Sequence, residues 1–203
     1  MSVRIDNGIE LCWGTPIYLA DLKGFDLSNV ILQDYISSNL KSFHSLNLVN
    51  PEESSLSNLD NWNIKESREL KSLVLQSFNE LMQALLTEYD EETQVNLMCS
   101  FAGSGIYNKT LQIKKKKSAW TALYFINIEE NKNFESKISF LDPRHGAGMV
   151  FDGFDVFGTS RELNLSNEKL LFFPSWLIPS DQSDIYSNDL FYIQFEFLFP
   201  SLT

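Results

Sequence analysis

The side chains best able to bind a metal or act as nucleophiles are few in this sequence. His44, His145, Cys12 and Cys99 are its only imidazoles and thiols. Structural zinc sites use four such ligands, usually in closely spaced pairs, and no two of these residues form such a pair. We therefore expect no metal site, with both histidines in loops near the surface and both cysteines as small buried side chains.

Length and charge limit the class of protein. The chain has 203 residues with 16 basic and 27 acidic side chains, a formal net charge of −11. A chain of this length can bury a full core, so we expect a single domain over residues 1–203. The acidity argues against a nucleic-acid partner, because affinity for phosphate comes largely from Lys and Arg. The sequence shows neither a long apolar run nor a signal-peptide core, which predicts no membrane span and no secretion by a signal peptide.

Residues 1–92 predict a strand and two helices packed on it. Residues 9–19 are typical of a strand closed by a Thr-Pro step. Residues 27–40 are typical of a helix with a buried apolar stripe of Val30, Ile31, Tyr35 and Ile36. Residues 41–62, which include His44, predict an irregular polar segment.

The longest periodic pattern predicts a second helix over residues 64–89. Apolar side chains recur there at helical spacing: Leu70, Val74, Phe78, Leu81, Met82, Leu85 and Tyr89. Asn63 followed by Glu66 resembles a capping box, which predicts where this helix begins.

Residues 93–203 predict the main β-rich part. Short strand-like runs occur at residues 95–102, 106–113, 120–128, 137–141, 161–165, 169–173 and 190–199. In the last run, four apolar residues from Phe191 to Phe197 alternate with Tyr192, Gln194 and Glu196, which predicts a half-buried strand. Helices followed by many short strands indicate an α+β protein whose strands close into a jelly roll.

Four segments resemble a single family and occur in its order. They are residues 14–18 (GTPIY), 120–125 (WTALYF), 140–144 (FLDPR) and 171–177 (LFFPSWL). They are similar to the 2-oxoglutarate- and iron(II)-dependent oxygenases common in bacteriophages and marine bacteria, over about residues 14–199. The resemblance implies a double-stranded β-helix, the jelly-roll form of these enzymes, with flanking N-terminal helices.

The resemblance also implies where the iron and 2-oxoglutarate ligands should lie. The first iron ligands would fall at Ile113 and Lys115, or at Leu111 and Ile113 if the lysine run holds a two-residue insertion. The distal histidine would fall at Pro179, and the basic anchor for 2-oxoglutarate at Leu190. Apolar Ile113 and Leu190 cannot bind iron or pair with a carboxylate, a cationic Lys115 would repel the metal, and Pro179 has no side-chain donor. We therefore expect no catalytic residues, no metal and no cofactor.

Two alternatives to this degenerate site stay open. One is an active oxygenase with other ligands, such as His145 with Asp142 or Asp152. The other is a jelly roll that binds a sugar or another small molecule by stacking on Trp120 and Trp176.

The concentrated positive charge is Lys114, Lys115, Lys116 and Lys117. It predicts a solvated hairpin loop or, alternatively, a contact with an acidic surface on a partner, including a second copy of this chain. The leading hypothesis is a non-catalytic oxygenase-fold protein that serves as a structural or protein-interaction component of a phage particle, in its neck, tail or capsid. Its expected partners are other protein subunits, phage structural proteins or itself, with no nucleic acid and no membrane, and its expected location is the virion or the host cytoplasm.

Overall fold

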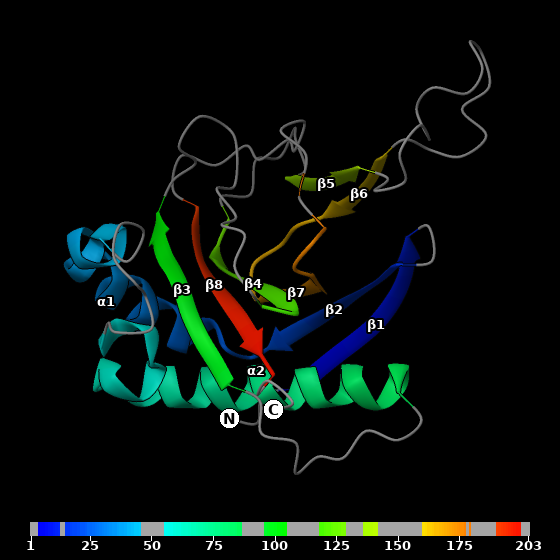
Figure 1. Ribbon diagram of the computed structural model, residues 1–203. Helices are drawn as coiled ribbons and strands as arrows, with labels where there is room; N and C mark the ends of the chain where they lie inside the picture. Colours follow the sequence, from blue (N-terminus) through cyan, green and yellow to red (C-terminus); the bar gives the residue numbers. More distant parts are fainter. Residues whose placement is uncertain are drawn as a thin grey trace.

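The computed structural model describes residues 4–12, 15–45, 55–86, 96–104, 118–128, 136–141, 160–177, 179 and 190–199. Its elements are β1 (Arg4–Cys12), β2 (Thr15–Lys23), α1 (Asp26–Ser45), the 3-10 turns η2 (Ser55–Ser57) and η3 (Leu59–Trp62), α2 (Lys65–Leu85), β3 (Asn96–Ser104), β4 (Trp120–Asn127), β5 (Lys137–Leu141), β6 (Ser160–Asn164), β7 (Lys169–Pro174) and β8 (Phe191–Leu198). Every pair among the described strands is antiparallel, and the described residues also form the long helices α1 and α2 (Figure 1). The predicted α+β class is confirmed.

A six-stranded sheet forms the centre of the fold, in the order β1-β2-β7-β4-β8-β3. The helices α1 and α2 pack on one side of it, which we call the helix face. The two-stranded sheet of β5 and β6 packs on the other side, the inner face (Figure 1). Because each face has its own apolar cluster, the central strands are buried on both sides.

Aromatic rings and two long-range hydrogen bonds hold the helices on the helix face. The Phe78 ring of α2 stacks on Phe197 of β8 with 4.0 Å between ring centroids. The Tyr18 hydroxyl of β2 donates to Glu80 Oε2 at 3.0 Å. The Tyr124 hydroxyl of β4 donates to Asn29 Oδ1 of α1 at 2.7 Å, and burial raises the pKa of Tyr124 well above its usual range. Both helices are therefore tied to strands distant in sequence.

The N-terminal segment is a hairpin, so the single strand predicted over residues 9–19 is wrong. β1 pairs with β2 from Arg4 opposite Lys23 to Cys12 opposite Thr15. The step from Thr15 to Pro16 begins β2 instead of closing a strand, which suits the extended backbone that proline imposes on its predecessor. β2 then pairs with β7, and the hairpin extends the large sheet.

The predicted buried stripe of the first helix is wrong in part. Ile36 is buried as expected, but Val30 and Ile31 are 57% and 43% exposed. The buried side chains are Phe25, just before α1, and Asn29, Leu32 and Ile36 within it. Two rows of apolar residues run along this helix, and periodicity alone does not tell which of them faces the sheet.

The segment before α2 contributes to the core, although its polar composition predicted an irregular segment. Leu59 and Trp62 are buried, and the Trp62 Nε1–H donates to the Leu56 carbonyl oxygen at 2.9 Å. Asn63 has a left-handed backbone (φ 57°) that ends η3, so the predicted capping box is wrong. α2 instead begins after Ile64, which makes no side-chain cap. Its predicted apolar face is confirmed at Leu70, Val74, Phe78, Leu81 and Met82.

The last strand is buried on both faces, which corrects the prediction of a half-buried strand. Phe195 and Phe197 lie on the helix face, whereas Tyr192, Gln194 and Glu196 alternate with them and are also buried. The predicted alternation is present, but the polar side chains are buried on the inner face and do not face water. The described helices include none that is long and apolar enough to cross a membrane.

Candidate functional site

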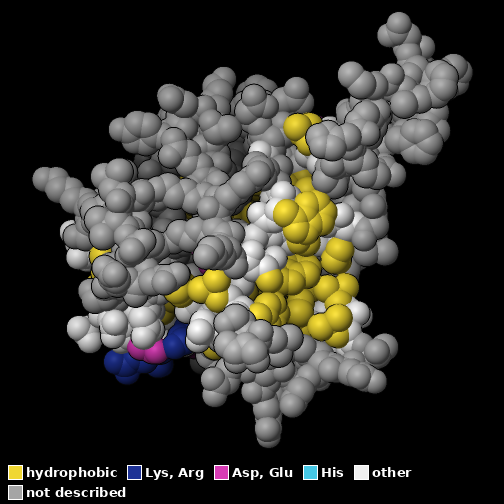
Figure 2. Space-filling model, in the orientation of Figure 1, with side chains coloured by type: hydrophobic (Ala, Val, Ile, Leu, Met, Phe, Trp, Pro, Cys, Tyr) yellow, Lys and Arg dark blue, Asp and Glu magenta, His cyan; other side chains and the backbone are white. Residues whose placement is uncertain are grey.

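The inner face is the place where the resemblance puts a site, and in the described residues it is mainly an apolar core. β2, β4 and β7 contribute apolar side chains that pack against β5, β6 and the segments around them: Ile17, Leu123, Phe125, Ile128, Ile138, Phe140, Leu163, Leu165, Leu171, Phe173, Leu177, Leu190 and Tyr192. Figure 2 shows hydrophobic side chains gathered between the β5–β6 pair and β2. The described part of this face therefore serves first to hold the two sheets together.

Two of the four positions implied by the resemblance lie within the described residues. Leu190 immediately precedes β8 and is fully buried in the inner-face cluster. Pro179 forms an isolated antiparallel bridge with Phe140 of β5. A buried leucine among apolar neighbours cannot pair with a carboxylate, so the residue present at the anchor position does not fit 2-oxoglutarate.

The structure describes only some of the remaining predicted site residues. Ile113, Lys115, Leu111 and the whole run Lys114, Lys115, Lys116 and Lys117 fall outside the described residues, as do His145, Asp142 and Asp152. His44 lies in α1, so its placement in an irregular segment is wrong. Cys99 is buried, as predicted for a structural thiol. The described residues contain no group of three or more His, Cys, Asp or Glu side chains that could hold a metal ion.

Polar side chains occupy the end of the inner face farthest from Leu190. Thr121 Oγ1 and Ser118 Oγ each lie 2.9 Å from Ser175 Oγ, which links the start of β4 to the end of β7. Glu196 is opposite Thr121 in the β4–β8 register and is fully buried. The sequence pattern gave no sign of this group, because a glutamate in an alternating strand predicts a side chain that faces solvent. Its hydroxyls form a structural bridge between β4 and the end of β7.

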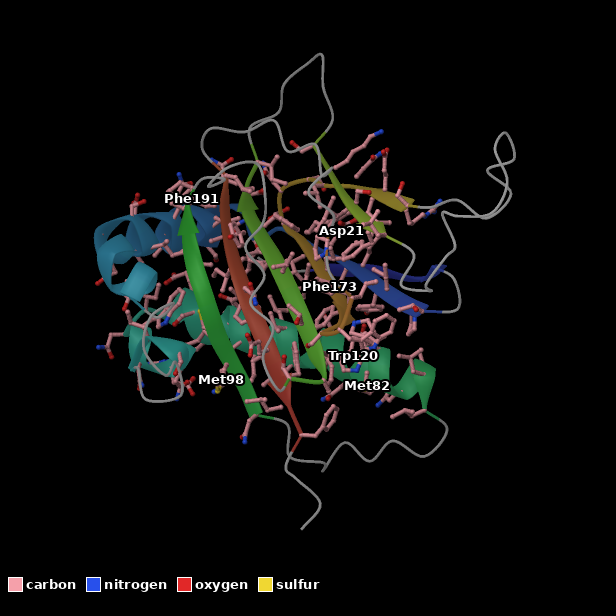
Figure 3. All side chains as sticks on the ribbon, turned by 45° about the horizontal axis from the view of Figure 1, so that its top comes forward. Asp21, Met82, Met98, Trp120, Phe173 and Phe191 are labelled. Carbon is pink, nitrogen blue, oxygen red and sulfur yellow. The ribbon has the colours of Figure 1, made fainter. Side chains whose placement is uncertain are left out.

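The two tryptophans considered for ligand stacking have different surroundings. Trp120 is half-buried and meets Phe78 edge-on at 6.4 Å between ring centroids. It lies near Met82 of α2, on the helix face (Figure 3). Trp176 follows β7 and is 56% exposed. Trp120 therefore belongs to the core.

A carboxyl pair sits where the β6–β7 turn meets the start of α1. Glu168 has a left-handed backbone (φ 63°), and its Oε1 accepts a hydrogen bond from the Phe25 N–H at 2.7 Å. Its own N–H donates to the Phe125 carbonyl, and its carbonyl accepts from the Leu22 N–H. Burial and the neighbouring Asp26 charge raise the pKa of Glu168, against the lowering effect of the Phe25 and Gly24 hydrogen bonds. One residue thus ties β2, β4 and α1 together.

A groove of about 530 Å³ lies on the opposite side of the large sheet from the β5–β6 pair. It runs between η2, α2 and the ends of β3 and β8, with Asn58, Asn96, Lys71 and Met98 among its lining residues. The Lys71 ammonium already pairs with Asp60. The groove therefore offers amides and one engaged lysine, which point to no particular ligand.

Comparisons with known proteins find structural likeness but no sequence match. No protein-family model and no curated protein matches this sequence. A solved structure of prolyl 4-hydroxylases from Phytophthora capsici is similar over 92% of this chain, with a TM-score of 0.46 and 10% sequence identity. This chain spans 59% of that structure's chain. At this TM-score and identity, the likeness assigns no chemistry to the chain.

The raised pKa of Glu168 predicts a pH-dependent stability. Because the folded-state pKa lies above the unfolded one, the stabilisation from this carboxyl is fully present below its unfolded pKa and is lost as the pH rises through its folded pKa. The Glu168→Gln variant keeps an oxygen that accepts from Phe25 and cannot ionise. We expect its free energy of unfolding, measured by urea denaturation, to exceed that of the wild type increasingly over that pH range.

The matched control is Glu162→Gln, which removes a carboxylate from the exposed ion pair with Lys137 on the β5–β6 sheet. It should not reproduce a gain that grows with pH. Parallel pH profiles for the wild type and Glu168→Gln would contradict the prediction.

Proposed function

We propose that this chain is a non-catalytic jelly-roll protein that works through protein contacts as a structural component. In a jelly roll of two Greek keys, the first, eighth, third and sixth strands form one sheet, and the second, seventh, fourth and fifth form the other. Taking β3 as the first strand, the order β3-β8-β4-β7 matches the first of these sheets. β1 and β2 extend that sheet beyond β7.

The second sheet supports the same topology. β5 and β6 take the places of its fourth and fifth strands. The bridge between Phe140 and Pro179 joins β5 to the segment after β7, where the seventh strand belongs. The second strand would fall between β3 and β4, which is where the sequence predicts a strand over residues 106–113. The order of the described strands therefore supports the proposal of a double-stranded β-helix, in which the strand predicted over residues 106–113 would belong to the second sheet.

The apolar packing in the described part of the inner face is the observation that supports the non-catalytic assignment. A 2-oxoglutarate oxygenase needs open coordination positions on iron and a cationic anchor for the far carboxylate of its cosubstrate. Here the anchor position is Leu190, which is fully buried among Tyr192, Phe125 and other apolar side chains. A scaffold can outlast the site it once held, because folding depends on the core and not on the site.

We expect Leu190→Arg to destabilise the protein by about 3–5 kcal/mol, because it places an unpaired charge in the inner-face cluster. Chemical denaturation measures the loss. Leu141→Arg is the control, since Leu141 is 47% exposed at the end of β5, and it should change stability by about 0.5 kcal/mol or less. A stable Leu190→Arg variant that acquires 2-oxoglutarate binding would instead reveal a working pocket.

The wild-type protein should neither retain iron nor turn over 2-oxoglutarate. The test supplies Fe(II), ascorbate and 2-oxoglutarate, then measures bound metal, succinate release and the melting temperature. A ligand at a hundred times its dissociation constant would stabilise the fold by about 2.7 kcal/mol, so binding would be visible even without turnover. Succinate release above the protein-free control would overturn the non-catalytic assignment in favour of an active oxygenase with other ligands.

The site of action that we propose is a phage particle, with the neck, tail or capsid as its location. This part of the proposal rests on the resemblance to a family common in bacteriophages. It predicts that quantitative mass spectrometry of purified particles detects the protein at a fixed copy number relative to the capsid subunit. Recovery only in the soluble fraction of infected cells would contradict a virion role.

A further inference from the structure

The outer side of α1 carries three large aliphatic side chains that the fold leaves in solvent. Leu27, Val30 and Ile31 are 73%, 57% and 43% exposed. Their spacing places them in a single stripe on the helix surface. The opposite side of α1, with Leu32 and Ile36, packs toward the sheet. Single exposed apolar residues are common, but a contiguous group of them marks an interaction surface.

The stripe has an acidic residue at each end. Asp26 precedes it and Asp34 follows it, and both are exposed. The carboxyl of Glu168 adds a third acidic group beside Asp26. Farther along the helix, the hydroxyls of Ser37 and Ser38 donate to the helix's own carbonyls at 2.8 Å. This surface, which we call the α1 stripe, is therefore apolar in the middle and negative at its rim.

The charges decide which kind of surface can cover the α1 stripe. If two α1 helices paired by a twofold axis, the aspartates of both copies would crowd into one small interface. Like charges brought together in this way cost several kcal/mol. A complementary surface must combine aliphatic side chains with positive charge. The α1 stripe of a second copy does not have this composition, so a different surface must cover it.

One segment of this chain has that composition. Leu111 and Ile113 are followed directly by Lys114, Lys115, Lys116 and Lys117, the one run of consecutive basic residues in a chain of net charge −11. The segment lies outside the described residues, so its sequence alone supplies the chemistry. The α1 stripe is exposed within its own chain, which leaves it accessible to another molecule.

We propose that residues 111–117 of one copy dock on the α1 stripe of a second copy. Leu111 and Ile113 would cover Leu27, Val30 and Ile31, and the lysines would meet Asp26 and Asp34. The two surfaces are different, so each copy keeps one of each free and the contact repeats from head to tail into a ring or a filament. The inference rests on the proposed structural role, for which repeated self-assembly is a natural use.

Sedimentation velocity on the full chain tests this contact over a wide range of protein concentration. The wild type should form oligomers that grow with concentration and weaken as salt screens the charges. Leu27→Ser/Val30→Ser removes the apolar stripe, and Lys115→Gln/Lys116→Gln removes two positive charges. Each variant alone should be monomeric, with an unchanged circular dichroism spectrum to show that the fold persists.

Mixing the two variants in equal amounts gives the sharpest outcome. The stripe variant still has its lysine segment and the lysine variant still has its α1 stripe, so one contact forms and growth stops at a dimer. Leu86→Ser, a change at a residue 52% exposed outside the stripe, is the matched control and should associate like the wild type. A monomeric wild type, or oligomers that persist in either variant, would overturn the inference. Neither result bears on the absence of 2-oxoglutarate turnover, which is measured separately.

Discussion

The structure depends on a six-stranded sheet that must be covered on both faces. Phe172, Phe195 and Phe197 project to the helix face, and Leu123, Leu171 and Phe173 to the inner face. Neither set can face water without losing the apolar burial that drives folding. The helices therefore cover one apolar face of the sheet, and the β5–β6 pair covers the other. Glu168 and Tyr124 then fix α1 against the strands through hydrogen bonds.

Sequence patterns predicted the bounds of helices and strands better than they predicted which side chains are buried. β5 was predicted with its observed bounds, and the buried face of α2 was predicted from its spacing. The errors at Glu196 and Val30 share a physical cause, because amphipathic patterns report the polarity of side chains and not what packs beside them. The burial of Trp62 was not predicted, because the short 3-10 turn that holds it has no periodic apolar pattern. The indole N–H of this buried ring donates to the Leu56 carbonyl.

The sequence indicated the candidate site only as positions implied by a resemblance. The resemblance put the 2-oxoglutarate anchor at Leu190, and the structure shows this residue packed in the inner-face cluster at the start of β8. The hydroxyl bridge of Ser118, Thr121 and Ser175 could not be foreseen, because it joins residues more than fifty positions apart through the β4–β7 register. Such contacts depend on strand pairing, which local sequence does not encode.

The packing of the described part of the inner face supports the proposal that this protein works through its outer surface. A jelly roll with an open interior can bind a ligand there, whereas Phe125, Phe140 and Phe173 pack as a core in the described part of this inner face. What selection can still act on without disturbing that core is the exposed surface. The aliphatic stripe on α1 is exposed and does not pack in the core. Its composition supports the proposed contact with a partner, because solubility alone would favour polar residues there.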